Sequence, residues 1–192
     1  MNIKQYKQQL LDELYEPYKQ CLLCPLGSLG KTTVVFGQGN PDARLMFIGE
    51  GPGRDEDMQG LPFVGRSGKL LNKVLDLHNT TRDDIFITNV VKCRPPNNRK
   101  PAPQEAHQCK THLLYKQIQI IRPRILCTLG SSATQALLNK DIKITKMRGI
   151  PVEHSGITII PTYHPAYILR NHTKLEVFSS DIQKAINFSQ KK

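Results

Sequence analysis

The sequence predicts an α/β protein, a three-layer α/β/α sandwich with a central parallel sheet of four strands. Four short apolar runs rich in β-branched residues are separated by segments with helical periodicity. The runs are continuous rather than alternating, which is typical of strands that are buried on both faces. A length of 192 residues suits one compact domain of this class.

The predicted strands and helices alternate along the chain. Strands are expected at residues 44–49, 85–91, 124–130 and 157–162, and helices at residues 3–19, 68–78, 103–121, 131–139 and 175–188. Strands that alternate with helices imply a parallel sheet covered by helices on both faces. Residues 1–192 are assigned to a single domain, which begins with a helix within residues 1–20 and ends in a basic tail at residues 188–192.

The composition is strongly basic, with a formal net charge of +11. Such an excess raises the local concentration of polyanions around a protein. Charge alone leaves two interpretations open, a nucleic-acid-binding protein and a basic protein that is merely soluble. No run approaches about 18 consecutive apolar residues, and the N-terminus lacks the apolar core of a signal peptide. We therefore expect a protein that binds no membrane and is cytoplasmic, associated with the nucleoid. Nothing in the sequence suggests an oligomer interface, so a monomer is expected.

The chain has five cysteines, and their number and spacing indicate a metal or redox site. They are Cys21, Cys24, Cys93, Cys109 and Cys127. An odd count without a secretion signal argues against a disulfide framework. Four thiolates from separated elements can converge on one centre, either a tetrahedral zinc ion or a 4Fe-4S cluster. The spacing leaves both open, as well as a core role for Cys93 and Cys109. Cys127, in the middle of a predicted strand, is expected in the core.

Polar and glycine-rich segments follow the predicted strands at the end of the sheet where α/β proteins bind ligands. Residues 50–53 form a Gly-rich turn that can present backbone N–H groups. Asn89 offers a donor and an acceptor, as the edge of a pyrimidine does. His164 follows the last strand, and Phe63 offers an aromatic face to a planar base. Together these residues predict a pocket for a base.

Three segments in the same order resemble the motifs of a known family. They are residues 50–71 (EGPGRDEDMQGLPFVGRSGKLL), 88–96 (TNVVKCRPP) and 161–170 (PTYHPAYILR). With the four-cysteine pattern, the chain resembles the family 4 uracil-DNA glycosylases, the iron–sulphur class, over roughly residues 20–187. The resemblance implies a four-stranded α/β/α sandwich. It also implies a DNA-repair enzyme that hydrolyses the N-glycosidic bond of a flipped deoxyuridine and leaves an abasic site.

The resemblance implies a role for each residue that binds the base. Phe63 would stack on the flipped uracil, and Asn89 would hydrogen-bond its edge. Glu56 would crowd the C5 position and help to exclude thymine. Gly51, at a position where alanine is common in the family, would offer a backbone contact near the base.

The resemblance also implies the catalytic residues and the cofactor. Glu50 would position or activate water, and His164 would donate a hydrogen bond to uracil O2 as negative charge builds there. A 4Fe-4S cluster, expected to be structural, would be held by Cys21, Cys24, Cys93 and Cys109. No basic insertion follows the first motif of the kind found in relatives that become covalently bound to DNA, which favours a turnover enzyme.

Several residues are predicted to contact uracil-containing DNA. Ser67 and Lys69 lie near a helix start, where a phosphate can bind. Arg94 belongs to a basic group with Lys92, Arg99 and Lys100 that would face phosphates. Arg170 lies in the segment after His164, which would wedge into the duplex. The alternative for the basic group is an ordinary solvated loop.

Three alternative functions remain open from the sequence. The first is a glycosylase for another deaminated base, such as hypoxanthine. The second is a non-catalytic iron–sulphur DNA-binding protein or redox sensor, and the third is a zinc protein of the same fold. Glu50, Asn89 and His164 occur together, and this combination favours catalysis, because a binding module needs no such set.

Overall fold

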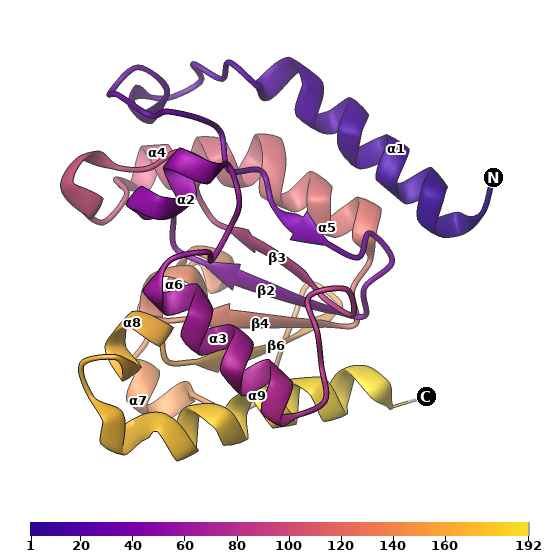
Figure 1. Cartoon of the computed structure of the whole chain (residues 1–192), viewed down its shortest axis with the longest axis vertical. Coiled ribbons are helices and arrows are strands. Elements are labelled where there is room, and N and C mark those ends of the chain that lie inside the picture. Colours follow the sequence, from indigo (N-terminus) through magenta and orange to yellow (C-terminus); the bar gives the residue numbers. More distant parts are fainter. Residues whose placement is uncertain (192) are drawn as a thin grey trace.

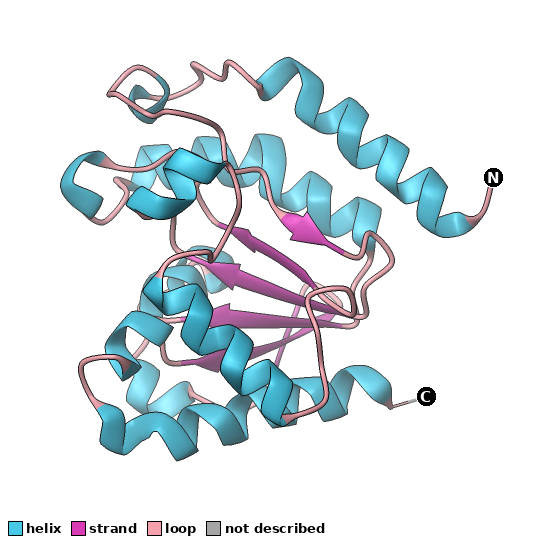
Figure 2. Cartoon of the chain, in the orientation of Figure 1, coloured by secondary structure: helices cyan, strands magenta, loops and turns pink. Residues whose placement is uncertain are grey.

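A six-stranded sheet runs through the middle of the protein, between two layers of helices (Figures 1 and 2). The structure is a computed structural model in which residues 1–191 are described. The strands are β1 (Gln38–Gly39), β2 (Leu45–Gly49), β3 (Phe86–Asn89), β4 (Ile125–Leu129), β5 (Val152–His154) and β6 (Ile157–Thr162), in the order β1-β3-β2-β4-β6-β5. The predicted α/β sandwich is confirmed.

The four predicted strands form the parallel centre of the sheet, β3-β2-β4-β6. The whole sheet has six strands, because two short antiparallel strands extend the edges of this four-stranded parallel centre. Strand β1 pairs with β3, and β5 pairs with β6. Neither edge strand contains a buried residue. These two strands therefore leave no apolar run in the sequence.

The helices cover the sheet in nine α-helical segments within residues 1–191. They are α1 (Ile3–Tyr15), α2 (Arg54–Gln59), α3 (Arg66–Leu77), α4 (Pro103–Cys109), α5 (Tyr115–Ile121), α6 (Ser131–Leu138), α7 (Ile144–Met147), α8 (Pro165–Ile168) and α9 (Leu175–Gln190). All five predicted helices occur, and α2, α7 and α8 are additional. Since α9 continues to Gln190, most of the predicted basic tail is helical; Lys192 lies outside the described residues.

The predicted helix at residues 103–121 contains a change of winding. A π-helical turn, Lys110–Leu114, joins α4 to α5 and begins directly after Cys109. Such wide turns inside α-helices are rare and occur frequently at functional sites. The turn changes the direction in which the following side chains point relative to Cys109.

Each face of the sheet has its own hydrophobic core. Met46 and Ile48 of β2 pack toward α1, α5 and α6, whereas Phe47 of the same strand packs toward α3 and α9. Figure 1 shows α1 and α5 on one side of the sheet and α3 and α9 on the other. All five residues of β2 are buried, which explains its continuous apolar run. Cys127 is fully buried in the second core, as predicted.

No helix in residues 1–191 combines the length and the apolar character that crossing a membrane requires.

Candidate active site

A cleft of about 610 Å³ opens where the four parallel strands end. Its walls come from the segments that follow β2, β4 and β6, from the last residue of β3, and from the loop that leads into α3. Eight of the predicted site residues line it: Glu50, Gly51, Glu56, Phe63, Ser67, Asn89, His164 and Arg170. The carboxyl ends of the parallel strands bring these residues together from distant parts of the chain.

Asn89 presents a buried acceptor to the cleft. Its side-chain Oδ1 is the one buried side-chain N or O atom in residues 1–191 that lacks a hydrogen-bond partner. Leaving such an atom unpaired costs about 1–3 kcal/mol, so native proteins rarely do so without a reason. A Cβ added to Gly49 would lie 2.4 Å from this oxygen and 2.6 Å from Cζ of Phe63. The glycine therefore leaves room for both side chains at the floor of the cleft.

Phe63 has an unusual backbone conformation, with φ of +54°. A bulky residue rarely adopts this left-handed conformation. The ring is almost fully buried, and its centroid lies 6.0 Å from that of the His164 ring, with 35° between the ring planes. A Cβ on Gly68 would lie 1.7 Å from the Phe63 carbonyl oxygen. Only a glycine at this position of α3 therefore allows the helix to approach the Phe63 backbone so closely. The Phe63 ring thus forms one wall of the cleft, facing His164.

Glu56 lines the cleft, but its carboxylate binds backbone N–H groups. Oε1 accepts from Val64 N at 3.0 Å and from Gly65 N at 2.9 Å, and Oε2 accepts from Gly53 N at 3.1 Å. The side chain is nearly buried. Glu56 therefore holds the loop that carries Phe63, a function that the sequence analysis did not foresee. Its predicted contact with the C5 position stays a prediction.

Arg82 holds the same loop and was missed by the sequence analysis. Its guanidinium donates to the carbonyl oxygen of Pro62 at 2.9 Å and to that of Phe63, and its Nε donates to Asn72 Oδ1 at 3.0 Å. Burial lowers the pKa of Arg82, and the carboxylate of Glu56 partly offsets this. A single arginine in a polar stretch before a strand carries no local pattern that would indicate such a contact.

His164 is held in one orientation at the start of α8. Its Nδ1 accepts a hydrogen bond from Ala166 N at 3.1 Å, which assigns the proton of the neutral ring to Nε2. Burial, together with the smaller effect of the nearby charge of Arg170, lowers the pKa of His164 to about 4. The ring is therefore neutral at neutral pH and has an Nε2–H group available to a ligand.

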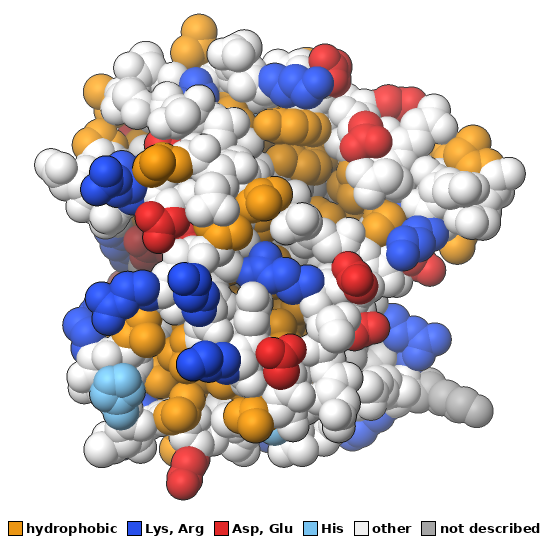
Figure 3. All heavy atoms as spheres, in the orientation of Figure 1, with side chains coloured by type: hydrophobic (Ala, Val, Ile, Leu, Met, Phe, Trp, Pro, Cys, Tyr) orange, Lys and Arg blue, Asp and Glu red, His pale blue; other side chains and the backbone are white. Residues whose placement is uncertain are grey.

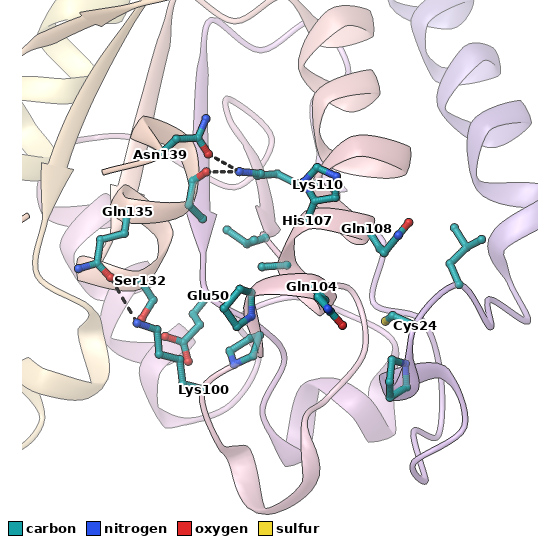
Figure 4. A pocket seen from close by; sticks show the side chains of 17 residues that line it. Cys24, Glu50, Lys100, Gln104, His107, Gln108, Lys110, Ser132, Gln135 and Asn139 are labelled. Atoms are coloured by element: carbon teal, nitrogen blue, oxygen red, sulfur yellow. Dashed lines mark hydrogen bonds between the residues drawn. The ribbon is translucent and has the colours of Figure 1, made fainter. Parts of the chain in front are cut away.

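Glu50 lies where this cleft meets a second, larger one of about 920 Å³ (Figure 4). The second cleft lies between α4 and α6, and Ser132 also lines both. Its lysines are held by neutral acceptors: Lys110 Nζ donates to Asn139 Oδ1 at 2.8 Å, and Lys100 Nζ donates to Gln135 Oε1 at 3.3 Å. Glu50 is half-buried and faces both spaces.

The residues predicted to contact DNA fall into two groups. Ser67, in the first turn of α3, and Arg170 line the cleft. Lys69 is exposed on α3, and Arg94 is half-buried, with its Nε bound to Asn98 Oδ1 at 2.8 Å; neither lines the cleft. Figure 3 shows Lys and Arg side chains gathered over α3 and α8, near the end of the sheet where the cleft opens.

The prediction that Lys92 faces phosphates is wrong. Its side chain is completely buried, and its ammonium group donates to the Asn89 carbonyl oxygen and to Gln117 Oε1, both at 2.7 Å. Burial lowers the pKa of Lys92 to about 7. Arg99, from the same basic group, pairs its two terminal nitrogens with Glu105 at 2.7 and 2.8 Å. The basic group is thus partly committed to internal contacts.

The four cysteines of the predicted cluster lie around one small cavity. Cys21, Cys24, Cys93 and Cys109 all line it, and none of them forms a disulfide. The backbone N–H of Lys92 donates to the Cys109 sulfur at 3.2 Å. Burial raises the pKa of Cys93 to about 12 and that of Cys109 to about 11. In the described part of the chain, no three His, Cys, Asp or Glu side chains converge closely enough to hold a single metal ion.

Comparison with known proteins identifies the family. The sequence matches the uracil DNA glycosylase superfamily over residues 36–188. It is 45% identical over 189 residues to a type-4 uracil-DNA glycosylase of Thermotoga maritima. The aligned region covers 96% of this chain and 97% of the relative. A protein of the same name from Archaeoglobus fulgidus is 41% identical over 182 residues, which are 91% of this chain and 90% of that relative. A type-5 uracil-DNA glycosylase of Pyrobaculum aerophilum is 31% identical over 157 residues, and the aligned region covers 72% of this chain and 68% of that relative. The chain therefore belongs to the uracil-DNA glycosylase superfamily and, within it, to the type-4 uracil-DNA glycosylases.

Proposed function

We propose that this protein is a DNA-repair glycosylase that excises uracil from DNA and leaves an abasic site. The observation that carries the proposal is the unpaired Oδ1 of Asn89 at the floor of a cleft, beside the Phe63 ring. The uracil edge supplies the missing donor at N3–H. The relatives with the highest identities quoted above are named type-4 uracil-DNA glycosylases.

The deoxyuridine enters the cleft only when it is flipped out of the helix. Flipping costs a few kcal/mol, and it costs least for a mismatched base such as uracil opposite guanine. The Phe63 ring stacks on the flipped base, and Asn89 accepts from N3–H and donates to O4. Uracil differs from thymine by one methyl group at C5, so discrimination must be steric at that position. Glu56 suits this function, because its carboxylate is fixed by three backbone N–H groups.

Cleavage breaks the bond between C1′ and N1, and uracil leaves as an anion. His164 donates its Nε2–H to O2, where negative charge develops, and the neutral ring is already oriented by Ala166. A preorganised donor of this kind contributes about 100- to 1000-fold in rate. Glu50 positions the water that attacks C1′ and stabilises the positive charge of the oxocarbenium-like sugar, as a carboxylate does in glycoside hydrolysis.

We propose that Cys21, Cys24, Cys93 and Cys109 hold a 4Fe-4S cluster. The residues fit this group: four thiols surround one cavity, no disulfide competes for them, and a backbone N–H already donates to the Cys109 sulfur. Four cysteine thiolates drawn from separated segments are the ligand set that a 4Fe-4S cluster takes. These cysteines, holding the cluster, would tie together the segment after α1, the segment after β3 and helix α4.

We further propose that the monomer binds uracil-containing DNA across the mouth of the cleft and is associated with the nucleoid. The first turn of α3 has no side-chain cap, so its N–H groups and Ser67 can bind a phosphate that flanks the flipped nucleotide. Lys69, Arg94 and Arg170 add positive charge around the cleft. The net charge of +11 speeds the encounter with DNA.

The test incubates the purified protein with labelled oligonucleotides that carry one uracil, thymine, cytosine or hypoxanthine, followed by alkali. We expect strand cleavage at uracil alone and absorbance near 400 nm from a brown protein. Glu50→Gln and His164→Ala should retain the colour and lose cleavage. Cleavage at hypoxanthine without cleavage at uracil would reassign the substrate. A protein that is colourless, contains zinc and is active would contradict the proposal of a 4Fe-4S cluster.

A further inference from the structure

We propose that Arg82 is a positioning residue that, together with Glu56, clamps residues 62–65 so that the Phe63 ring is held ready to stack on the base. We call residues 62–65 the Phe63 loop. The inference rests on the proposed function, because it assigns the ring of Phe63 to the flipped uracil. It adds a residue that lies outside all three motifs that carry the family resemblance.

Arg82 binds the carbonyl groups of the Phe63 loop. Its two terminal nitrogens donate to the oxygens of Pro62 and Phe63, and its Nε donates to Asn72 Oδ1 on α3. The three donor-bearing nitrogens of the guanidinium are thus all bound within the protein. A planar fork of this kind fixes two acceptors at once, which a lysine cannot do. Arg82 lies in the segment just before β3, so it ties the loop to a different part of the sheet.

Glu56 binds the N–H groups of the same loop. Its Oε1 accepts from Val64 and Gly65, and its Oε2 accepts from Gly53 at the start of α2. The carbonyls of the first two loop residues are therefore held by a cation, and the N–H groups of the last two by an anion. Each charged side chain binds the backbone dipoles that its own charge favours. The four consecutive residues have little freedom to rotate.

The clamp is needed because Phe63 is in a strained conformation. Its φ of +54° is rare for an aromatic residue, and such strain persists only where surrounding contacts over-determine the backbone. The ring lies against the backbone of Gly49 and faces His164. If the carbonyl of Phe63 were released, the backbone could relax to an ordinary extended conformation, and the ring would leave its place in the cleft.

The variant Arg82→Ala should therefore lose stacking and keep the fold. Base–aromatic stacking contributes enough that we expect kcat/KM on uracil-containing DNA to fall about 10- to 100-fold. Arg82→Lys should recover only part of the loss, because one ammonium group cannot replace the fork. Arg44→Ala is the matched control: it removes one positive charge from an exposed position just before β2, at the opposite end of the sheet, and should leave kcat/KM unchanged.

A double-mutant cycle separates positioning of the ring from a general structural effect. If Arg82 acts through Phe63, Arg82→Ala should change kcat/KM by no more than about twofold when Phe63 is already alanine. A further tenfold loss in the Phe63→Ala background would overturn the proposal. Circular dichroism and the cluster absorbance of each variant report whether the fold is retained.

A measurement of the ring itself makes the inference independent of activity. We would label the six phenylalanines with 4-fluorophenylalanine, assign the Phe63 ¹⁹F resonance with Phe63→Leu, and compare wild type, Arg82→Ala and Arg44→Ala. We expect the Phe63 resonance to shift and broaden in Arg82→Ala alone. An unchanged resonance would overturn the clamp. If the resonance responds but wild type does not cleave uracil-containing DNA, the clamp stands and the substrate assignment fails.

Discussion

The ammonium group of Lys92 donates a hydrogen bond of 2.7 Å to the backbone carbonyl of Asn89, the residue that would read the base edge. The backbone N–H of the same lysine donates to the sulfur of Cys109. One completely buried residue therefore contacts both the cysteine cavity and the residue at the floor of the cleft. This arrangement gives the cysteine site a physical connection to base recognition through three residues.

Lys92→Met should test that connection. The methionine keeps the buried volume but removes the ammonium donor to the Asn89 carbonyl and leaves Gln117 Oε1 with only the 3.4 Å hydrogen bond from the Thr88 hydroxyl. We therefore expect the free energy of unfolding to fall by about 1–3 kcal/mol. Urea unfolding of the protein with its cluster measures this, and the KM for uracil-containing DNA should rise. Lys69→Met, at an exposed position of α3, is the control for stability. A Lys92→Met protein as stable as wild type, with an unchanged KM, would show that the contact is unimportant.

The sequence was sufficient to predict the parallel core and most of the cleft. Strands buried on both faces leave continuous apolar runs, and ligands of parallel sheets bind where the strands end. The two rules together place Glu50, Asn89 and His164 at the same end of the sheet. The edge strands β1 and β5 are not predicted, because two or three residues without a buried side chain leave no periodic pattern of apolar residues.

The sequence does not predict which side chains bind backbone groups in distant parts of the chain. Arg82 and Lys92 each hold carbonyl groups, and Glu56 holds N–H groups, but the identity of those partners depends on tertiary packing. A basic residue next to other basic residues is typical of a solvated or phosphate-facing segment, so the sequence pattern alone misplaces Lys92 at the surface. Its burial follows from the path of the chain after β3, where polar groups of Asn89 and Gln117 replace water around the ammonium group.

Gly49→Ala should impair base recognition without disturbing the rest of the sheet. The added methyl group would lie 2.4 Å from Oδ1 of Asn89 and 2.6 Å from the ring of Phe63, so both side chains must move. A displacement of about 1 Å can cost about 100-fold in rate, and we expect a loss of that order in kcat/KM on uracil-containing DNA. Circular dichroism should show an intact fold. Activity within threefold of wild type would mean that these two residues do not form the base pocket.

His164 should remain neutral far below the usual range of histidine. Its folded-state pKa is lowered from 6.5 to about 4, so the folded protein binds fewer protons than the unfolded chain between these values. The stability that it contributes is complete above about pH 6.5 and is lost as the pH falls toward 4. An NMR titration of the His164 Cε1 proton, assigned with His164→Asn, checks the midpoint directly. A midpoint near 6.5 would show that the ring is charged during the reaction at mildly acidic pH, contrary to its proposed function as a neutral donor.

Lys69 and Arg170 should contribute to DNA binding through charge alone. Lys69 is exposed on α3, and Arg170 is exposed at the mouth of the cleft, so each can neutralise one phosphate. Replacing either with glutamine should weaken binding equally for all sequences and reduce the slope of log affinity against log salt by about 0.7–0.9. Fluorescence anisotropy with labelled DNA at several salt concentrations measures the slope. Arg44→Gln, at the other end of the sheet, should leave it unchanged, and equal slopes for all three variants would place the DNA on a different surface.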